Sequence, residues 1–536
     1  MEFTVIEGAQ VHTDGMVRGL GEQYAYEPGE GRRNLLHVLR ELGVDVPNAC
    51  GGNGRCGKCR VVIQEKTPEP ADEDKAVFSQ RELEMGYRLA CRHELADGMV
   101  IAVPAQSSED MQILGLVSRE EKPGCPEGSL LKERDIRIAI DLGTTTIAAA
   151  MLVDGRAVDS ISVINHQSRY GADVISRIKA SMEGKGEALR KLVQEDLLSC
   201  MEKLCVRQKV EKGLVREIVI AGNTTMLHLL LGYPCDGLGK APFHPVTLEL
   251  GRDNFEAVFG NRVESTATVV LLPGFSAYVG ADIVSGLYSR HLEEQEKKIL
   301  LVDLGTNGEM ALGNRQKLYV TSTAAGPAFE GGNLSCGACS IPGAICHVGE
   351  DGISTIGDRA PIGLCGTGVI EAMAYMRRKG ILDENGLLQG DYFETGYSVT
   401  GRFGPQIVIT QEDIRQVQMA KAAIRAGIEI LCLRSGIRQE EIDELQLAGG
   451  FGYFLDPRAA IAIGMLPELP KGRICAVGNA SLEGAVRFAA EGAESKTAPE
   501  ADRDGVVTKI AALAEEISLA EDPLFEEKFM EYMAFR

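Results

Sequence analysis

The stretch I-R-I-A-I-D-L-G-T-T-T-I-A-A-A-M-L-V-D-G, from Ile136 to Gly155, decides how most of this chain folds. Its pattern is that of a buried apolar strand, a tight turn of Asp, Leu, Gly and Thr, and a second strand. A near copy, K-I-L-L-V-D-L-G-T-N-G-E-M-A-L-G, runs from Lys298 to Gly313. Two copies of one strand–turn–strand unit predict a duplicated domain of the α/β class.

The chemistry of the two turns predicts a phosphate site. Glycine lets the backbone approach a phosphate closely, and threonine hydroxyls and main-chain amides can donate to its oxygens. Asp141 and Asp303 would repel bare phosphate, so we expect them to face each other across a cleft and hold hydrated Mg²⁺. The turn residues predicted to contact the nucleotide are Gly143, Thr144, Thr145, Gly305, Thr306 and Asn307.

Three more glycine-rich segments fit a nucleotide site. The run from Leu445 to Pro457 reads as a strand ending in Gly449 and Gly450, where an adenosine can lie flat against the backbone. The segment 326–332 can curve around the γ-phosphate, and 363–368 opens an apparent helix whose amides can contact nucleotide. The glycines predicted to take part in these two segments are Gly326, Gly331, Gly366 and Gly368.

Two glutamates are candidates for catalysis. Glu330, within the second of these segments, is expected to position water or Mg²⁺, and the alternative is an exposed side chain on a structural turn. Glu309, just after the second phosphate turn, is expected to orient the attacking water. A surface carboxylate on a β-hairpin is the alternative for Glu309.

In this order, the segments resemble the two phosphate motifs and the adenosine motif of the acetate kinase, sugar kinase, Hsp70 and actin superfamily. The resemblance implies two ribonuclease-H-like subdomains that close over Mg-ATP. It also implies that 278–287 and 477–486 form connecting helices. Lys421, on a predicted helix over 417–433, matches the position from which related proteins contact the adenosine. A solvated helix face is the alternative for Lys421.

A second candidate site lies near the N-terminus, in the cysteine-rich run C-G-G-N-G-R-C-G-K-C. Three thiols in a glycine-rich loop, with a fourth further on, are typical of a [2Fe–2S] ferredoxin of the plant or adrenodoxin type. A zinc site usually presents two C-x₂-C pairs, and only one occurs here. A disulfide pair is the other alternative. The predicted cluster ligands are Cys50, Cys56, Cys59 and Cys91.

The flanking sequence fits a small β-grasp ferredoxin-like domain over residues 1–104. Strands are expected at 2–7, 23–27, 60–64 and 99–103, with a short helix at 34–42. Residues 105–134 are rich in Pro, Gly, Ser and charge and are predicted to be a linker. The ATPase domain is then expected to occupy 135–536. Cys336 and Cys339 form another C-x₂-C, but no convincing fourth ligand accompanies them, so we leave them out of the predicted sites.

Composition limits the partners. A formal net charge of −21 argues against nucleic acid and anionic membranes, because both need a basic face. The start, M-E-F-T-V-I-E-G, has neither the basic nor the apolar segment of an export signal, and no apolar run is long enough to span a bilayer. A chain of this kind with 14 cysteines is expected to be a cytoplasmic metal or cluster protein.

Longer runs make the resemblance more specific. The segments 220–232, 241–246, 324–337 and 522–533 match the reductive activators of corrinoid-dependent enzymes. That family implies an ATP-dependent transfer of one electron from a [2Fe–2S] cluster to inactive Co(II), which restores Co(I) in a corrinoid protein or methyltransferase. A low-potential donor of the ferredoxin or flavodoxin kind is implied, and a homodimer is a further expectation. The alternative is a nucleotide-dependent clamp or redox sensor acting on a low-potential metalloenzyme.

Overall fold

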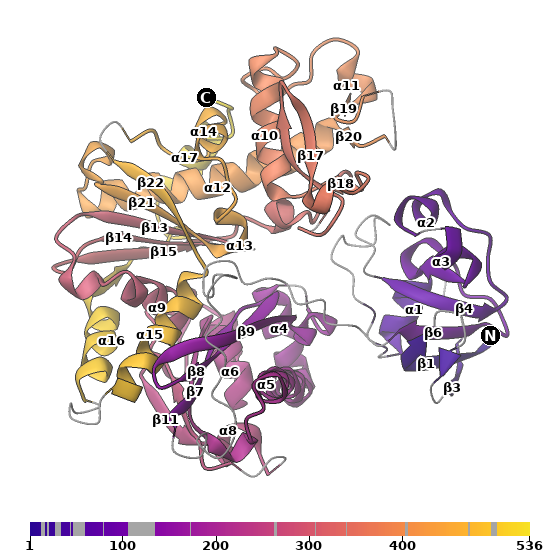
Figure 1. Ribbon diagram of the computed structural model, residues 1–536. Helices are drawn as coiled ribbons and strands as arrows, with labels where there is room; N and C mark the ends of the chain where they lie inside the picture. Colours follow the sequence, from indigo (N-terminus) through magenta and orange to yellow (C-terminus); the bar gives the residue numbers. More distant parts are fainter. Residues whose placement is uncertain are drawn as a thin grey trace.

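The computed structural model (Figure 1) covers the chain with gaps. It describes residues 1–11, 17–18, 21–26, 34–42, 44, 46, 59–78, 80–104, 134–171, 173–261, 265–305, 307–338, 340–401, 406–469, 472–494 and 501–536. Outside the described residues lie Cys50, Cys56, Thr306, Cys339 and residues 105–133 of the linker predicted at 105–134.

The N-terminal residues form the predicted β-grasp sheet. Its order is β2-β1-β6-β4-β5, with β3 also paired to β1, and β1 runs parallel to β6. Leu35, Leu36, Val38 and Leu39 of the helix bury their side chains against it, as their spacing predicts. The elements are β1 (Glu2–Val11), β2 (Val17–Arg18), β3 (Gly21–Ala25), α1 (Leu35–Glu41), β4 (Arg60–Glu65), α2 (Asp72–Val77), α3 (Gln80–Glu84), β5 (Tyr87–Leu89) and β6 (Val100–Pro104).

The first D-L-G-T copy begins a six-stranded sheet of order β11-β12-β10-β7-β8-β9. Strands β7, β8 and β9 are antiparallel neighbours, whereas β10 and β12 add in parallel on the other side of β7. Its strands are β7 (Ile136–Leu142), β8 (Thr146–Val153), β9 (Arg156–Ile164), β10 (Val215–Gly222), β11 (Gly251–Asn254) and β12 (Thr268–Leu271). Its helices are α4 (Val174–Ala180), α5 (Gly186–Gln208), α6 (Thr224–Leu231), α7 (Asp236–Gly239), α8 (Phe255–Phe259) and α9 (Ala281–Ser289).

The second copy begins a sheet of order β22-β21-β13-β14-β15-β23. Strands β13, β14 and β15 are antiparallel, and β21 and β22 add in parallel beyond β13. The order β22-β21-β13-β14-β15 therefore repeats β12-β10-β7-β8-β9 of the first sheet. This repeat confirms the duplicated ribonuclease-H-like fold. Its strands are β13 (Ile299–Leu304), β14 (Gly308–Gly313), β15 (Leu318–Thr323), β21 (Glu444–Ala448), β22 (Arg473–Gly478) and β23 (Ala514–Glu516).

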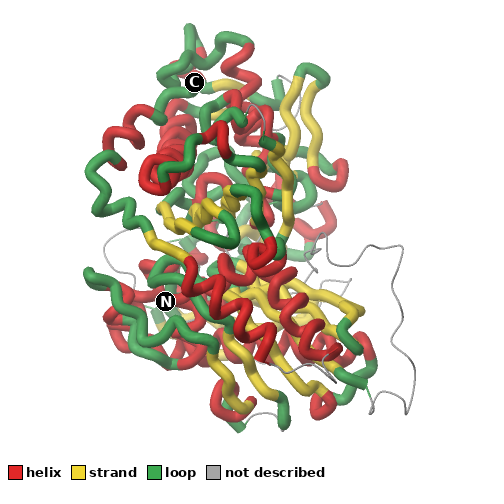
Figure 2. The backbone as a smooth tube through the Cα atoms, turned by 90° about the vertical axis from the view of Figure 1, so that its left-hand side faces the viewer, coloured by secondary structure: helices red, strands yellow, loops and turns green. Residues whose placement is uncertain are grey.

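The helices and small sheets of this second half complete the fold. The helices are α10 (Gly366–Arg378), α11 (Tyr392–Thr395), α12 (Gln411–Ser435), α13 (Gly449–Gly452), α14 (Pro457–Ala462), α15 (Ala480–Glu494), α16 (Ala501–Leu513) and α17 (Phe525–Glu531). The small strands are β16 (Ala344–Gly349), β17 (Gly352–Thr355), β18 (Gly363–Leu364), β19 (Tyr397–Ser398) and β20 (Val408–Ile409). Figure 2, turned by 90°, shows strands lying side by side with helices across them.

Helices α15 and α16, near the end of the chain, return to the first sheet. Helix α15 follows β22 in sequence but packs against α9, and Figure 1 shows α9, α15 and α16 as neighbours. A buried ion network joins α16 to the first sheet. Glu217 of β10 accepts hydrogen bonds from Arg137 of β7 at 2.5 Å and from Arg503 of α16 at 2.6 Å. Each half of the duplicated domain therefore contributes residues to the region between the sheets.

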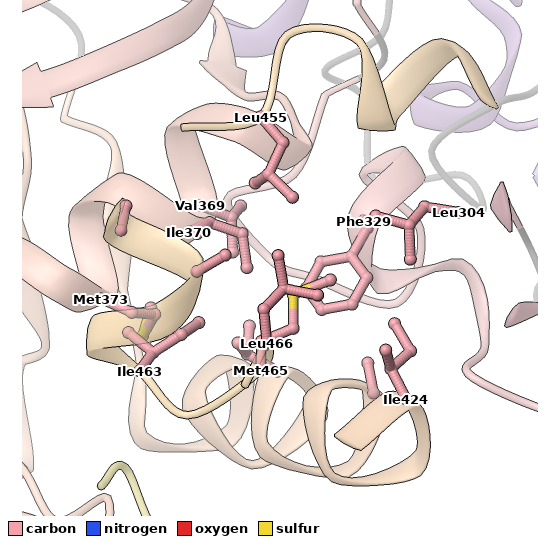
Figure 3. Packing of buried hydrophobic residues seen from close by; sticks show 14 of the residues in the cluster. Leu304, Phe329, Val369, Ile370, Met373, Ile424, Leu455, Ile463, Met465 and Leu466 are labelled. Atoms are coloured by element: carbon pink, nitrogen blue, oxygen red, sulfur yellow. The ribbon is translucent and has the colours of Figure 1, made fainter. Parts of the chain in front are cut away.

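A large apolar core lies under the second sheet. Figure 3 shows Leu304, at the end of β13, and Phe329 among Met465, Leu466 and Ile424. Because Leu304 directly follows Asp303, this packing fixes the position of the second predicted phosphate turn. None of the described helices has both the length and the apolar composition needed to cross a membrane.

Candidate functional site

The two predicted turns end the first strand of each sheet. In the first turn, the Gly143 amide donates to the Thr146 carbonyl at 3.1 Å. A Cβ at Gly143 would lie 2.6 Å from that oxygen, so only glycine closes this turn. Thr144 is half-buried and Thr145 exposed, which leaves the Thr145 side chain accessible to a ligand. In the second turn, the Gly305 amide donates to the Asn307 carbonyl at 3.0 Å.

A cluster of four carboxylates lies where the two halves meet. Asp141, Asp303 and Glu309 were predicted, and the structure adds Asp282 from the first turn of α9. Burial and the charge of Asp141 raise the pKa of Asp282 to about 7. Burial, with the charges of Asp282 and Asp141, raises the pKa of Asp303 to about 7 as well.

Glu309 belongs to the same cluster and is not a surface residue. Its side chain is 8% exposed, and burial together with the charges of Asp282 and Asp303 raises its pKa well above the ordinary value. The groups that shift the pKa values of the four carboxylates are carboxylates and neutral donors; no basic side chain is among them in the described part of the chain. Four acids brought together in this way fit a hard divalent cation with oxygen ligands such as Mg²⁺.

The four carboxylates predict that the metal-free protein loses stability as pH rises and that a bound cation restores this stability. A carboxyl whose pKa is raised stabilises the fold below its ordinary pKa, and this contribution is lost as pH rises through the folded value. For Asp282 and Asp303 the window runs from 3.8 to about 7. We therefore expect the thermal midpoint of the metal-free protein to fall between pH 5 and 8. Millimolar Mg²⁺ should restore it at pH 8 and have little effect at pH 5; an equal effect at both pH values would contradict this site.

Asp141 is held differently from the other three carboxylates. Its oxygens accept from Asn479 Nδ2 at 2.9 Å and from Ser481 Oγ at 2.7 Å. Asn479 also accepts from the Leu482 amide at 2.8 Å and so caps the start of α15. Two residues of the second half therefore orient the aspartate of the first turn.

Glu330 lies beside the second predicted phosphate turn. Its Oε1 is 4.0 Å from the position that a Cβ would take at Gly305. The preceding residue, Phe329, stacks on Phe451 with ring centroids 5.2 Å apart and planes 1° apart. Since Phe451 follows Gly450, this stack joins the predicted γ-phosphate loop to the predicted adenosine turn.

The glycines predicted to contact the nucleotide outside the two phosphate turns divide into two groups. Gly326 and Gly450 have no atom within 4 Å of a would-be Cβ, so their backbones face open space. The others are crowded by the protein itself. A Cβ would lie 2.3 Å from the Ala338 carbonyl at Gly331, 2.0 Å from Phe329 O at Gly366, 2.1 Å from Ile345 O at Gly368 and 2.7 Å from Asp303 Oδ1 at Gly449. Packing alone therefore requires glycine at these four positions.

Lys421 does not project into this site. Its side chain is fully buried, and its ammonium donates to the carbonyls of Tyr532 at 2.6 Å and Ala534 at 2.5 Å. Burial lowers its pKa to about 7. This arrangement differs from both predictions for Lys421, the adenosine contact and the solvated helix face. The reason is that the last residues of the chain fold back over α12.

Two of the four predicted cluster ligands lie among the described residues. Cys59 precedes β4 and Cys91 follows β5, and both are buried. Their sulfur atoms are 3.3 Å apart, which is too far for a disulfide and close enough for both to bind one metal ion. The Ala90 amide donates to the Cys59 carbonyl at 2.8 Å and fixes the pair. Cys50 and Cys56 lie outside the described residues.

Comparisons with known proteins agree with both the predicted iron–sulfur domain and the predicted nucleotide-binding domain. A model described as the 2Fe-2S iron-sulfur cluster binding domain matches residues 19–95. The RACo middle region matches residues 136–295, and the C-terminal domain of RACo, the ASKHA domain, matches residues 297–536. The chain belongs to the RACo family. The two RACo models divide it between the two sheets, at the point where the duplicated half begins.

Named relatives of this family cover most of the chain. The corrinoid activation enzyme RamQ of Eubacterium limosum is 29% identical, over 92% of this chain and 94% of the relative. A [Co(II) methylated amine-specific corrinoid protein] reductase of Methanosarcina barkeri is 25% identical, over 64% and 68%. A solved structure, a reductive activator for corrinoid, iron-sulfur protein, is 26% identical with a TM-score of 0.66 and covers 99% of this chain and 98% of its own.

Proposed function

We propose that this RACo-family chain is an ATP-dependent reductive activator that returns a corrinoid protein from Co(II) to Co(I). The observation that carries the proposal is the presence, in one chain, of a buried thiol pair and a four-carboxylate cluster between duplicated phosphate turns. The relatives' names supply the corrinoid protein as partner.

The thiols and the carboxylates have separate tasks in this proposal. Cys59 and Cys91, with Cys50 and Cys56, hold a [2Fe–2S] cluster, which supplies one-electron transfer. Asp141, Asp282, Asp303 and Glu309 would hold Mg²⁺, which would neutralise charge on the nucleotide phosphates, and Gly326 and Gly450 would let the backbone approach the nucleotide. Glu309 and Glu330 are the candidates for orienting the attacking water.

The energetics explain why ATP is needed. Plant-type [2Fe–2S] centres have potentials near about −400 mV. Co(II) in corrinoids is harder to reduce, and for one electron a gap of about 59 mV costs about 1.4 kcal/mol. A nucleotide-driven change that contributes about 3 kcal/mol of differential affinity offsets about 130 mV. We further propose a low-potential ferredoxin or flavodoxin-like donor, a cytoplasmic location and a homodimer.

The test is anaerobic reactivation followed by the Co(I) absorption band. We expect Co(I) when the reductant, ATP, the chain and a Co(II) corrinoid protein are all present. A control without the chain measures direct reduction by the reductant. A non-hydrolysable ATP analogue should fail to support repeated turnover, because closure of the two subdomains could not be reset. Full reactivation with the analogue would favour the nucleotide-dependent clamp instead.

A further inference from the structure

A cavity of about 260 Å³ lies in the first half of the ATPase domain. Its walls come from α6, from the loop before β11 and from the end of β12. Their apolar side chains are Leu227, Leu231, Val246, Leu248, Leu250 and Leu271. An apolar cavity of roughly 150 Å³ already holds a benzene ring, so this one has room for a large side chain. The runs 220–232 and 241–246, which the nucleotide site does not use, both contribute to it.

The walls of this cavity are held in place before any ligand binds. The Val246 amide donates to His228 Nε2 at 2.9 Å, and His228 Nδ1 donates to the Thr224 carbonyl at 2.8 Å. Burial lowers the pKa of His228, so its ring is neutral and both nitrogens are engaged. The Gly274 amide donates to the Leu248 carbonyl at 2.9 Å and fixes the far side of the loop. A site already in its bound shape loses little entropy when a ligand enters.

The mouth of the cavity is apolar and negatively charged. Val246, which lines the cavity, is 53% exposed. Glu249 and Asp253 line the cavity with exposed side chains and form no ion pair with any described residue. No lysine or arginine is among the described lining residues. This charge pattern disfavours a phosphate and favours an apolar group that carries a cation beside it.

The cavity adjoins the carboxylate cluster. Ala281 lines it, and the next residue, Asp282, belongs to the cluster. The start of α9 packs tightly against the start of α6, because a Cβ at Gly280 would lie only 2.6 Å from the Thr224 amide nitrogen. A group that fills the cavity would contact Ala281 and so reach the first turn of α9, which also carries Asp282. Two sites that share an element in this way can influence each other's affinity.

We propose that this cavity seats an apolar side chain next to a lysine or arginine on the corrinoid protein, and that its occupation stimulates ATP hydrolysis through Ala281 and Asp282. The identity of the partner rests on the proposed function. The net charge of −21 adds a long-range attraction toward such a basic surface. Hydrolysis would then accelerate only when a substrate protein is in place.

The first test reverses one charge at the mouth. In Glu249→Lys the exposed carboxylate becomes a cation, and Glu256→Lys, on α8 outside the cavity, is the matched control. With a Co(II) corrinoid protein that the wild type reactivates, we expect Glu249→Lys to weaken binding about tenfold and to lose the stimulated ATPase. The basal ATPase should stay within about twofold of wild type, because the cation ligands are unchanged. Wild-type binding by Glu249→Lys would overturn the proposal.

The second test needs no corrinoid protein. Benzylammonium carries a ring and a cation, so millimolar concentrations should raise the thermal midpoint of the wild type, while benzoate should not. Glu249→Lys should lose this response and Glu256→Lys should keep it. Equal responses to benzylammonium and benzoate would overturn the ligand chemistry. A wild type that responds to benzylammonium but reactivates no corrinoid protein would support the cavity's chemistry and overturn the partner and the proposed function.

Discussion

Asp303→Asn is expected to reduce ATP hydrolysis by about 1,000-fold and, at the same time, to stabilise the metal-free protein. No described donor forms a hydrogen bond with the Asp303 carboxylate, and burial with the charges of Asp282 and Asp141 raises its pKa to about 7. At pH 8 the ionised carboxylate is therefore costly, and the neutral amide removes that cost. At pH 5 Asp303 is already protonated, so the gain in stability should disappear.

Kinetics and melting curves together check this prediction. The thermal midpoint without Mg²⁺ should rise by a few degrees at pH 8 and stay unchanged at pH 5. Asp141→Asn should lose activity without the gain, because Asp141 accepts from Asn479 and Ser481. Asp391→Asn, an exposed carboxylate outside the cluster, is the control. If Asp303→Asn melts earlier than wild type at pH 8, Asp303 is a structural carboxylate and not a cation ligand.

The sequence predicts the parts of this site whose chemistry is local. An apolar strand that ends in Asp-Leu-Gly-Thr fixes both the fold and the carboxylate, and both Asp141 and Asp303 lie where that pattern places them. Glu309 is also where the hairpin places it, although only the structure shows that it is buried. The two connecting helices appear as α9 and α15; both begin three residues later than predicted, and α15 continues eight residues beyond its predicted end.

Asp282, Asn479 and Ser481 were not predicted, although the duplication carried a signal for two of them. Val279-Gly280 precedes Ala281-Asp282, and Val477-Gly478 precedes Asn479-Ala480, each at the start of the helix after its sheet. Aligning the two copies at these Val-Gly pairs would have identified Asp282 and Asn479 as equivalent to within one residue. Their role depends on the exchange of α9 and α15 between the halves, which no local pattern contains.

Other differences arise from long-range packing. The Lys421 ammonium donates its hydrogen bonds to Tyr532 and Ala534, which lie more than a hundred residues later and return to α12. The glycine pattern could not separate Gly366, whose Cβ would collide with Phe329, from Gly450, which faces open space. A glycine required by packing and one required by a ligand look the same in a single sequence.

Cys59→Ser is expected to abolish reactivation of Co(II) while leaving nucleotide binding intact. The Cys59 and Cys91 sulfurs lie 3.3 Å apart, so both would bind the same iron. Serine is a poor ligand for soft iron–sulfide sites, and the variant should lose iron and its visible absorption. The ferredoxin-like core is separate from the cores of the two ATPase sheets, so Mg-ATP affinity should stay within about twofold of wild type.

The control for this variant is Cys475→Ser, a half-buried thiol on β22 that lies far in sequence from the cluster loop. It should keep its iron and its reactivation rate. The comparison separates electron transfer from ATP use, because Cys59→Ser would still hydrolyse ATP when the Co(II) partner is added but would produce no Co(I). Hydrolysis without reduction is the signature expected if the carboxylate cluster and the thiols act in sequence. If Cys59→Ser reduces Co(II) at the wild-type rate, the thiols are not on the electron path, and the chain acts on its partner as a nucleotide-dependent clamp.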